Sequence, residues 1–183
     1  WYAKIHGKPK DQYKIISCHL GNGSSMCAIR HGHSIDTSMG FTPLEGLVMG
    51  TRCGDIDPSL VLHMMAMTGE GPSEMENLLT RKSGLYGLSG LSADMRLLLD
   101  FRKKGDSRAA MAIDVFCYRV KKYIGSYLAS LNGADAIVFT GGIGENAAPV
   151  REQICEGLDG LGIRVDKTAN AAAIGKEAQI SLP

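Results

Sequence analysis

The chain has 183 residues, with 20 Lys plus Arg against 19 Asp plus Glu and a formal net charge of +1. This length suits one α/β domain, and the balanced charge argues against a polyanion-binding or membrane-surface protein, so we expect neither nucleic acid nor membrane as partner. No apolar run approaches the roughly 18 residues of a membrane span, and the start resembles no signal peptide. Five scattered cysteines without a CxxC pair favour a reducing cytoplasm over a disulfide framework or zinc site. Because residue 1 is Trp rather than Met, we expect a fragment.

Three short apolar runs at the start of the chain predict a β-meander. Residues 14–20 form a predicted strand, which the turn Gly21-Asn22-Gly23 separates from a second strand at 26–29. A third strand at 34–38 completes the meander.

The pattern then becomes helical. Thr42 and Glu45 have capping-box spacing and predict a helix start, as do Asp57-Pro58 for a helix that ends near Gly69. Further along, the spacing of Ser73 and Glu76 predicts another helix start. Residues 84–90 are predicted to form a loop, and residues 93–104 a helix.

The longest predicted element is a helix over 107–132, stopped by Gly133. It is followed by a buried strand at 136–139, a glycine loop at 140–146 and a helix at 149–158. Residues 162–165 are predicted to return as a strand parallel to the previous one. The fold is therefore expected to be α/β or α+β, a sheet of hairpin and parallel strands packed by helices. The apolar stripe predicted for the long helix is Met111, Val115, Val120, Ile124, Leu128 and Leu131.

The first candidate motif is the turn HLGNGSS, residues 19–25. Gly21 and Gly23 permit backbone conformations in which successive N–H groups converge on an anion, and Ser24 and Ser25 add hydroxyl donors. Such a nest suits a phosphate. An ordinary tight hairpin, with His19 as a packed strand histidine, is the alternative.

The second candidate is FTGGIGEN, residues 139–146, between a strand and a helix, where glycines and a helix N-terminus favour a nucleotide phosphate. A specific alternative exists, because residues 142–147 satisfy G-x-G-x-x-A and Asp166 follows where a ribose-binding acid would stand in a dinucleotide-binding domain. Against this alternative, Glu145 would put a carboxylate in the loop that faces the pyrophosphate. Such a fingerprint also normally lies at the start of a dinucleotide-binding domain.

The third candidate is the loop GTRCGDIDP, residues 50–58. Arg52 lies between glycines, and its guanidinium can grip a phosphoryl group with two hydrogen bonds during transfer. The alternative is a salt bridge from Arg52 to Asp55 or Asp57, of which Asp57 is also a predicted helix cap.

Asp94 and Arg96 form a weaker pair that would border a nucleotide pocket or lie as ordinary surface charge. The sequence contains no G-x-x-x-x-G-K-[ST] P-loop. Any ATP site must therefore be built from separate loops.

Taken in this order, HLGNGSS, DTSMGFTPLEGLVMGTRCGDIDP, SADMR and FTGGIGEN resemble the C-terminal half of the acetate/propionate kinase family over about residues 14–166. The resemblance implies a ribonuclease-H-like, actin-like ATPase fold (the ASKHA superfamily), with ATP between two such domains. It also implies that residues 1–183 are a single nucleotide-binding domain, the second half of a two-domain kinase. The implied reaction is reversible phosphoryl transfer between ATP and acetate, giving ADP and acetyl phosphate, with Mg²⁺. Propionate is the alternative substrate.

The resemblance also implies roles for individual residues. Arg52 would be catalytic and would stabilise the transferring phosphoryl group, whereas no residue of this chain is expected to ligate metal. Cys53 stands where serine is expected, and Met95 where the family often has an aromatic side chain. The expected nucleotide-binding residues are His19, Leu20, Gly21, Asn22 and Gly23 at the phosphates, Asp94, Met95 and Arg96 at the adenosine, and Gly142, Ile143, Gly144, Glu145 and Asn146 at the adenine, ribose and inner phosphate.

Other parts of the family's machinery are expected outside this chain. The acetate pocket, a catalytic aspartate, a phosphate-facing histidine and a magnesium-site residue would come from the N-terminal half, and a metal-site glutamate from beyond Pro183. We therefore expect the chain alone to fold and bind nucleotide weakly without turning over. A homodimer is a further implication of the resemblance. A dinucleotide-binding domain, or a non-catalytic dimerisation module using the helix 107–132, remain alternatives.

Overall fold

The computed structural model describes residues 2–7 and 9–182, so Trp1 and Pro183, to which two expectations refer, lie outside the described residues. The chain divides into two compact units. The sheet unit contains residues 1–38 and 117–183, and the helical unit contains residues 39–116.

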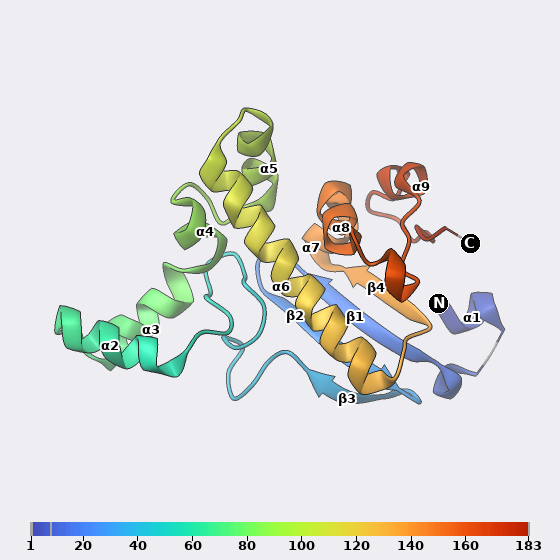
Figure 1. Ribbon diagram of the computed structural model, residues 1–183, viewed down its shortest axis with the longest axis horizontal. Coiled ribbons are helices and arrows are strands. Elements are labelled where there is room, and N and C mark those ends of the chain that lie inside the picture. The colour runs from blue at the N-terminus through green and yellow to red at the C-terminus, as the bar shows by residue number, and fades with distance from the viewer. Residues whose placement is uncertain (1, 8, 183) are drawn as a thin grey trace. The chain divides into compact units, whose positions relative to one another are not determined.

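The sheet unit is built on four strands in the order β3-β2-β1-β4 (Figure 1). The strands β1 (Lys14–Leu20), β2 (Ser24–Arg30) and β3 (His33–Thr37) are antiparallel neighbours, which confirms the predicted meander. The strand β4 (Ala136–Thr140) pairs parallel to β1. The sheet therefore joins a local meander to one strand that arrives from far along the chain.

A long helix, α6 (Ser107–Leu131), runs from the helical unit into the sheet unit, where it crosses the sheet (Figure 1). The helix is confirmed, and Gly133 closes it with a positive φ of 86° and an N–H bond to the carbonyl of Leu128. The predicted stripe is partly wrong, because Met111 is 47% exposed and Val115 and Leu128 are half-buried. The buried stripe recurs every three or four residues at Ala109, Ile113, Phe116, Val120, Ile124, Tyr127 and Leu131.

After β4, the described part of the chain contains four short helical elements: α7 (Gly141–Asn146), α8 (Ala148–Cys155), η2 (Asp159–Leu161) and α9 (Lys167–Ala172). The predicted glycine loop at 140–146 is wrong, because six of its residues form α7. The predicted parallel strand at 162–165 is also wrong. Within the described residues, that segment contributes one isolated antiparallel bridge, between Val165 and Ser181.

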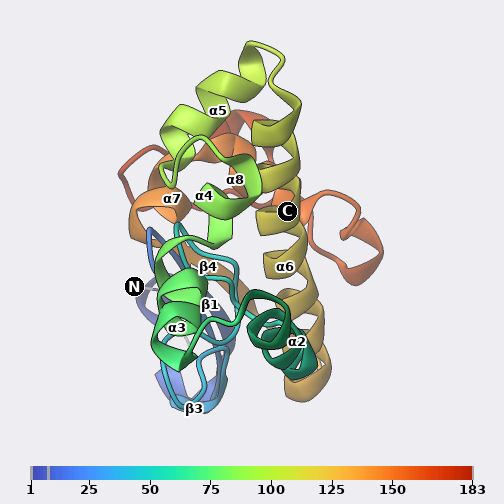
Figure 2. The same cartoon turned by 90° about the vertical axis from the view of Figure 1, so that its left-hand side faces the viewer.

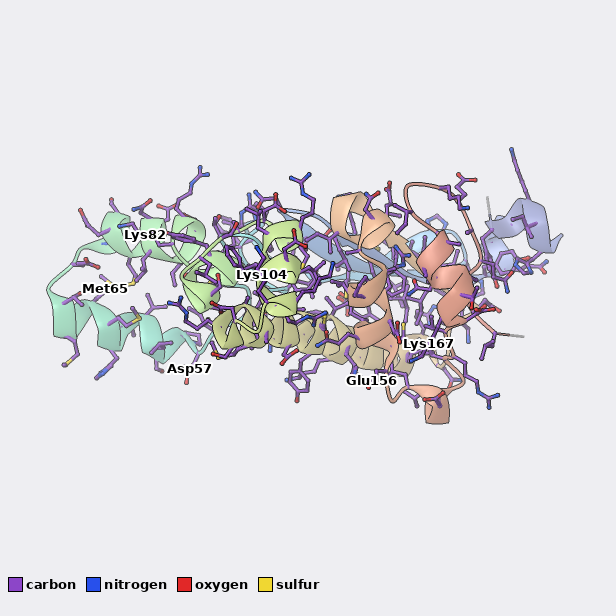
Figure 3. The ribbon with its side chains drawn as sticks, turned by 90° about the horizontal axis from the view of Figure 1, so that it is seen from above. Asp57, Met65, Lys82, Lys104, Glu156 and Lys167 are labelled. Atoms are coloured by element: carbon purple, nitrogen blue, oxygen red, sulfur yellow. The ribbon has the colours of Figure 1, made fainter. Side chains whose placement is uncertain are left out.

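Two lysine contacts tie these C-terminal elements together. Figure 3 labels Lys167 at the start of α9, where its ammonium lies 2.7 Å from a carboxylate oxygen of Glu152 in α8. Glu156, labelled at the end of α8, accepts a 2.6 Å hydrogen bond from Lys121 of α6 through its carbonyl.

At the other end of the chain, α1 (Tyr2–His6) and η1 (Lys10–Gln12) precede β1.

The helical unit contains α2 (Pro58–Thr68), α3 (Pro72–Arg81), α4 (Gly84–Ser89), α5 (Met95–Lys103) and the start of α6 (Figure 2). The start and end of α2 are confirmed, since Asp57 caps it at 2.9 Å from the N–H of Ser59 and Gly69 ends it with φ 73°. The capping box for α3 is wrong, because Gly71 is the N-cap and Ser73 lies inside the helix. The predicted loop at 84–90 is α4 instead.

The helix predicted from Thr42 is wrong, because residues 42–50 form turns and irregular backbone. Leu47, Val48 and Met49 are all buried, so three consecutive side chains face the interior. Three successive residues of a helix span about 200°, which is wider than the stripe that a surface helix typically buries. Their backbone instead bonds to another segment, as in the 2.8 Å bond from the N–H of Leu85 to the carbonyl of Met49.

Candidate functional site

Two of the predicted nucleotide-binding segments lie at one edge of the sheet unit. The parallel pairing of β1 and β4 sets His19 opposite Thr140, so the turn after β1 and the helix after β4 both leave the carboxyl ends of neighbouring strands. In α/β sheets this edge is where ligands bind. The register therefore brings residues 19–23 and 142–146 together although 121 residues separate His19 from Thr140.

The first segment is a compact hairpin turn. The pairing of Leu20 with Ser24 closes it, and the N–H of Gly21 donates to the carbonyl of Gly23 at 3.1 Å. Ser24 is buried, and its hydroxyl donates at 3.1 Å to the carbonyl of Gly21. The expectation that Ser24 offers its hydroxyl to an anion is therefore wrong, because that hydroxyl closes the turn. The side chains of His19 and Asn22 are exposed.

The second segment approaches the first through its backbone. Gly141 has φ 77°, and a Cβ there would lie 2.7 Å from the carbonyl oxygen of Leu20, so only glycine fits. A Cβ at Gly144 would lie 3.3 Å from the backbone of Phe139. At Gly142, in contrast, a Cβ would meet nothing within 4 Å. Two glycines of this segment thus serve close packing, whereas Gly142 borders open space.

The polar side chains of α7 bond within their own helix. Glu145 accepts a 3.1 Å hydrogen bond from the N–H of Gly141, and Asn146 donates to the carbonyl of Gly142 at 2.9 Å. The N–H of Gly141 therefore holds the carboxylate of Glu145 at the start of the same helix.

The geometry is wrong for the dinucleotide-binding alternative. The G-x-G-x-x-A residues lie within α7 and at its C-cap Ala147, whereas that fingerprint forms the turn between a strand and a helix. Asp166 follows no parallel strand among the described residues. Its carboxylate caps α9 by accepting from the N–H groups of Thr168 and Ala169 at 2.9 and 3.0 Å.

Sequence reasoning missed Arg151, a buried arginine directly behind the second segment. Its side chain is almost fully enclosed, and its Nη1 donates to the carbonyls of Gly144 and Glu145 at 2.8 and 2.9 Å. Through Nε and Nη2 it also bonds to Asn170 and to the carbonyl of Ala173. Burial lowers the pKa of Arg151, because desolvation disfavours the charged form. The guanidinium thus fastens the end of α7 to α9.

One sequence signal could have identified this arginine. Arg151 follows the apolar Val150 and precedes Ile154 by three residues, so it lies on the side of α8 that both of these buried residues occupy. A charged residue on such a face must find polar partners inside the protein.

The predicted catalytic residue, Arg52, belongs to the helical unit. Its Nη1 donates to the carbonyl of Pro43 at 3.3 Å and to the sulfur of Met49 at 3.7 Å. Behind the loop, Gly84 has φ 63°, and a Cβ there would lie 2.7 Å from the carbonyl oxygen of Arg52. The N–H of Ser83 also bonds to the carbonyl of Thr51 at 3.0 Å. The backbone that carries Arg52 is therefore anchored to the start of α4.

Cys53, beside this arginine, is half-buried. Its thiol donates to the carbonyl of Gly54 at 3.1 Å, and burial raises the pKa of Cys53. The thiol thus packs in place of the expected serine with a hydrogen bond of its own.

The predicted adenosine-binding residues open α5 in the same unit. Asp94 caps that helix by accepting from the N–H of Arg96 at 2.9 Å, and the two side chains form an ion pair of 2.6 Å. The hydrogen bond from the Arg96 guanidinium holds the pKa of Asp94 below its usual range. Met95 is buried. The contact of these three residues with adenosine stays a prediction.

Comparisons with known proteins identify the relatives of this chain. The family model described as the Acetokinase family matches residues 2–183. An acetate kinase of Methanosarcina thermophila is 54% identical over 181 residues, which are 99% of this chain and 44% of that protein. This chain therefore spans about half the length of the curated relatives that it matches.

Solved structures of the same family have this fold. The crystal structure of Porphyromonas gingivalis acetate kinase superposes with a TM-score of 0.96 at 43% identity, covering 100% of this chain and 46% of that one. A propionate kinase from Francisella tularensis gives a TM-score of 0.91 at 46% identity, covering 98% of this chain and 45% of that one. The expected α/β class, a ribonuclease-H-like and actin-like fold, is confirmed, and the chain belongs to the Acetokinase family.

Proposed function

We propose that this chain is the nucleotide-binding half of an acetate kinase, which transfers a phosphoryl group reversibly between ATP and acetate to give ADP and acetyl phosphate. The proposal rests on one observation above all, the parallel β1–β4 pairing that brings the two glycine segments to one sheet edge. We propose further that residues 1–183 act as one nucleotide-binding domain.

The ATP or ADP phosphates are proposed to bind the turn Gly21-Asn22-Gly23 together with His19. The exposure of Asn22 and His19 supports this, since a ligand can reach both without displacing core side chains. The rest of the nucleotide is proposed to lie along residues 142–146. The open space beside Gly142 supports this placement of the nucleotide.

Arg52 is proposed to stabilise charge on the phosphoryl group during transfer, and Asp94, Met95 and Arg96 to border the adenosine. A planar guanidinium matches the oxygens of a phosphoryl group with two hydrogen bonds. The anchored backbone behind Arg52 supports the role, because a catalytic cation must be held in position before the reaction.

Magnesium is proposed to enter on the nucleotide phosphates. Among the described residues, no group of three or more His, Cys, Asp or Glu side chains is arranged to hold a metal ion.

The acyl-binding pocket is proposed to lie in the other half of the enzyme, because this chain spans about half of its relatives. Acetate is proposed over propionate, since the similar curated relatives are acetate kinases.

The enzyme is proposed to be a cytoplasmic homodimer, and the 183-residue chain alone is not expected to turn over. In the part of the chain that the structure describes, no helix has the length and apolar character needed to cross a membrane.

Calorimetry with Mg-ADP, beside NAD, tests the proposed site with a matched pair of glycine variants. Gly142 and Gly125 both lie in helices, and a Cβ at either meets nothing within 4 Å. Gly142→Ala is expected to weaken Mg-ADP binding, because its methyl group occupies space proposed for the ligand. Gly125→Ala, in the middle of α6, is expected to leave binding unchanged. Equal affinities for the two variants, or a preference for NAD, would contradict the proposal.

A further inference from the structure

The hydroxyl of Thr140 does not cap the helix that follows it. Thr140 is the N-cap residue of α7, where a threonine oxygen normally accepts a hydrogen bond from an N–H group of the first turn. No such bond forms here. The N–H of Gly141 is bonded instead by the carboxylate of Glu145 at 3.1 Å.

The same hydroxyl contacts the proposed phosphate-binding histidine. Its oxygen lies 3.1 Å from Nδ1 of His19. The two residues are direct partners in the β1–β4 ladder, so their side chains leave the same face of the sheet. Backbone pairing thus places the two side chains next to each other.

A neutral imidazole carries one N–H, and the hydrogen bond at one ring nitrogen decides which nitrogen holds the proton. When a hydroxyl donates to Nδ1, the proton belongs on Nε2, at the tip of the ring. A phosphate oxygen is an acceptor and requires that donor. In the opposite tautomer the lone pair of Nε2 would face the anion.

We infer that Thr140 is a positioning residue, whose hydroxyl donates to Nδ1 of His19 and thereby holds the Nε2–H tautomer that binds a nucleotide phosphate. This inference rests on the proposed function for the role of the phosphate. The hydrogen bond itself does not depend on it.

Long-range ¹H–¹⁵N NMR of the nucleotide-free chain tests the tautomer, because such spectra distinguish protonated from unprotonated ring nitrogens. His19→Ala identifies its signals among those of the five histidines. We expect unprotonated Nδ1 and protonated Nε2 in the unmodified chain and in Thr140→Ser, which keeps the hydroxyl. Thr140→Val, of similar shape without the hydroxyl, is expected to give a mixture of tautomers. A protonated Nδ1 in the neutral ring of the unmodified chain would overturn the inference.

Calorimetry with Mg-ADP tests the consequence. Thr140→Val is expected to weaken binding by about 2- to 10-fold, the usual worth of one neutral hydrogen bond, while Thr140→Ser stays within about 2-fold. In a His19→Ala background, Thr140→Val is expected to have no further effect, since it acts through the histidine. An equal loss with and without His19 would overturn the positioning role.

The two proposals fail in different ways. If the unmodified chain binds no Mg-ADP while His19 has the expected tautomer, the proposed function fails and the hydrogen-bond assignment stands. If Mg-ADP binds and Thr140→Val matches the unmodified chain, the inference fails alone. Should Thr140→Val not fold, the tautomer of the unmodified chain and the affinity of Thr140→Ser still decide.

Discussion

The two places where this chain carries its proposed functional residues are held in different ways. At the sheet edge, His19 and the α7 residues meet through pairing between strands that are distant in sequence, with Arg151 buried behind them. In the helical unit, Asp94 and Arg96 are held by a helix cap and an ion pair between near neighbours. The geometry of the sheet-edge segments therefore depends on the core of their unit, whereas that of the Asp94–Arg96 pair depends on local contacts.

The largest expected effect concerns chemistry rather than structure. In a full-length acetate kinase carrying this segment, Arg52→Ala is expected to lower kcat by about 10³- to 10⁵-fold, because its charge acts mainly in the transition state. The Kd for Mg-ADP is expected to change little. Steady-state kinetics and calorimetry measure the two quantities. Arg52→Lys serves as the control, because it keeps the positive charge but lacks the planar guanidinium. If Arg52→Ala kept its kcat but lost affinity for Mg-ADP, the assigned role would be refuted.

Arg151→Leu is expected to be the most destabilising change at the sheet edge. It leaves the buried carbonyls of Gly144 and Ala173 without the donor that Arg151 supplies, and we expect a loss of about 3–5 kcal/mol in the free energy of unfolding. Urea unfolding followed by circular dichroism measures this.

The matched control is Lys167→Leu, which removes another α8–α9 contact. That ion pair is exposed, so only a small fraction of the loss caused by Arg151→Leu is expected. Similar losses for the two variants would show that burial does not distinguish these contacts.

Asp94→Ala, in the helical unit, is expected to have a smaller effect than Arg151→Leu. The loss of the cap costs about 1 kcal/mol near pH 7. The pKa of Asp94 is lowered in the folded chain, so its contribution is fully present above the unfolded value of about 4 and disappears as the pH falls through the lower folded value. Unfolding measured at pH 7 and at pH 2–3 is expected to show the difference from the unmodified chain shrinking in acid. A difference independent of pH would mean that the carboxylate charge is not involved.

Elements with strong local signals could be predicted from the sequence. The meander follows from apolar runs separated by glycine turns, and α2 follows from Asp57-Pro58 and Gly69. The α7 helix and the irregular segment at 42–50 could not be predicted, because packing overrode local preference in both. Gly141 suits a backbone approach to Leu20, and the carbonyl of Met49 accepts a hydrogen bond from Leu85 of α4.

In the candidate site, too, some features follow from local sequence and others from tertiary packing. The glycine motifs, and their resemblance to a family, indicated which residues to consider. Their meeting at one edge depends on β-pairing over 121 residues, and local sequence patterns carry no record of such a pairing. Arg151 and the contact between His19 and Thr140 also depend on tertiary structure. Only the side-chain geometry reveals their partners.

The long separation between β1 and β4 has a consequence for synthesis of the protein on the ribosome. The meander emerges before β4, and one side of β1 stays without its parallel neighbour until β4 has been made. An unpaired strand edge is a template for association with other chains. Products that stop before residue 136 are therefore expected to aggregate, and a chaperone that covers β1 would protect the nascent polypeptide.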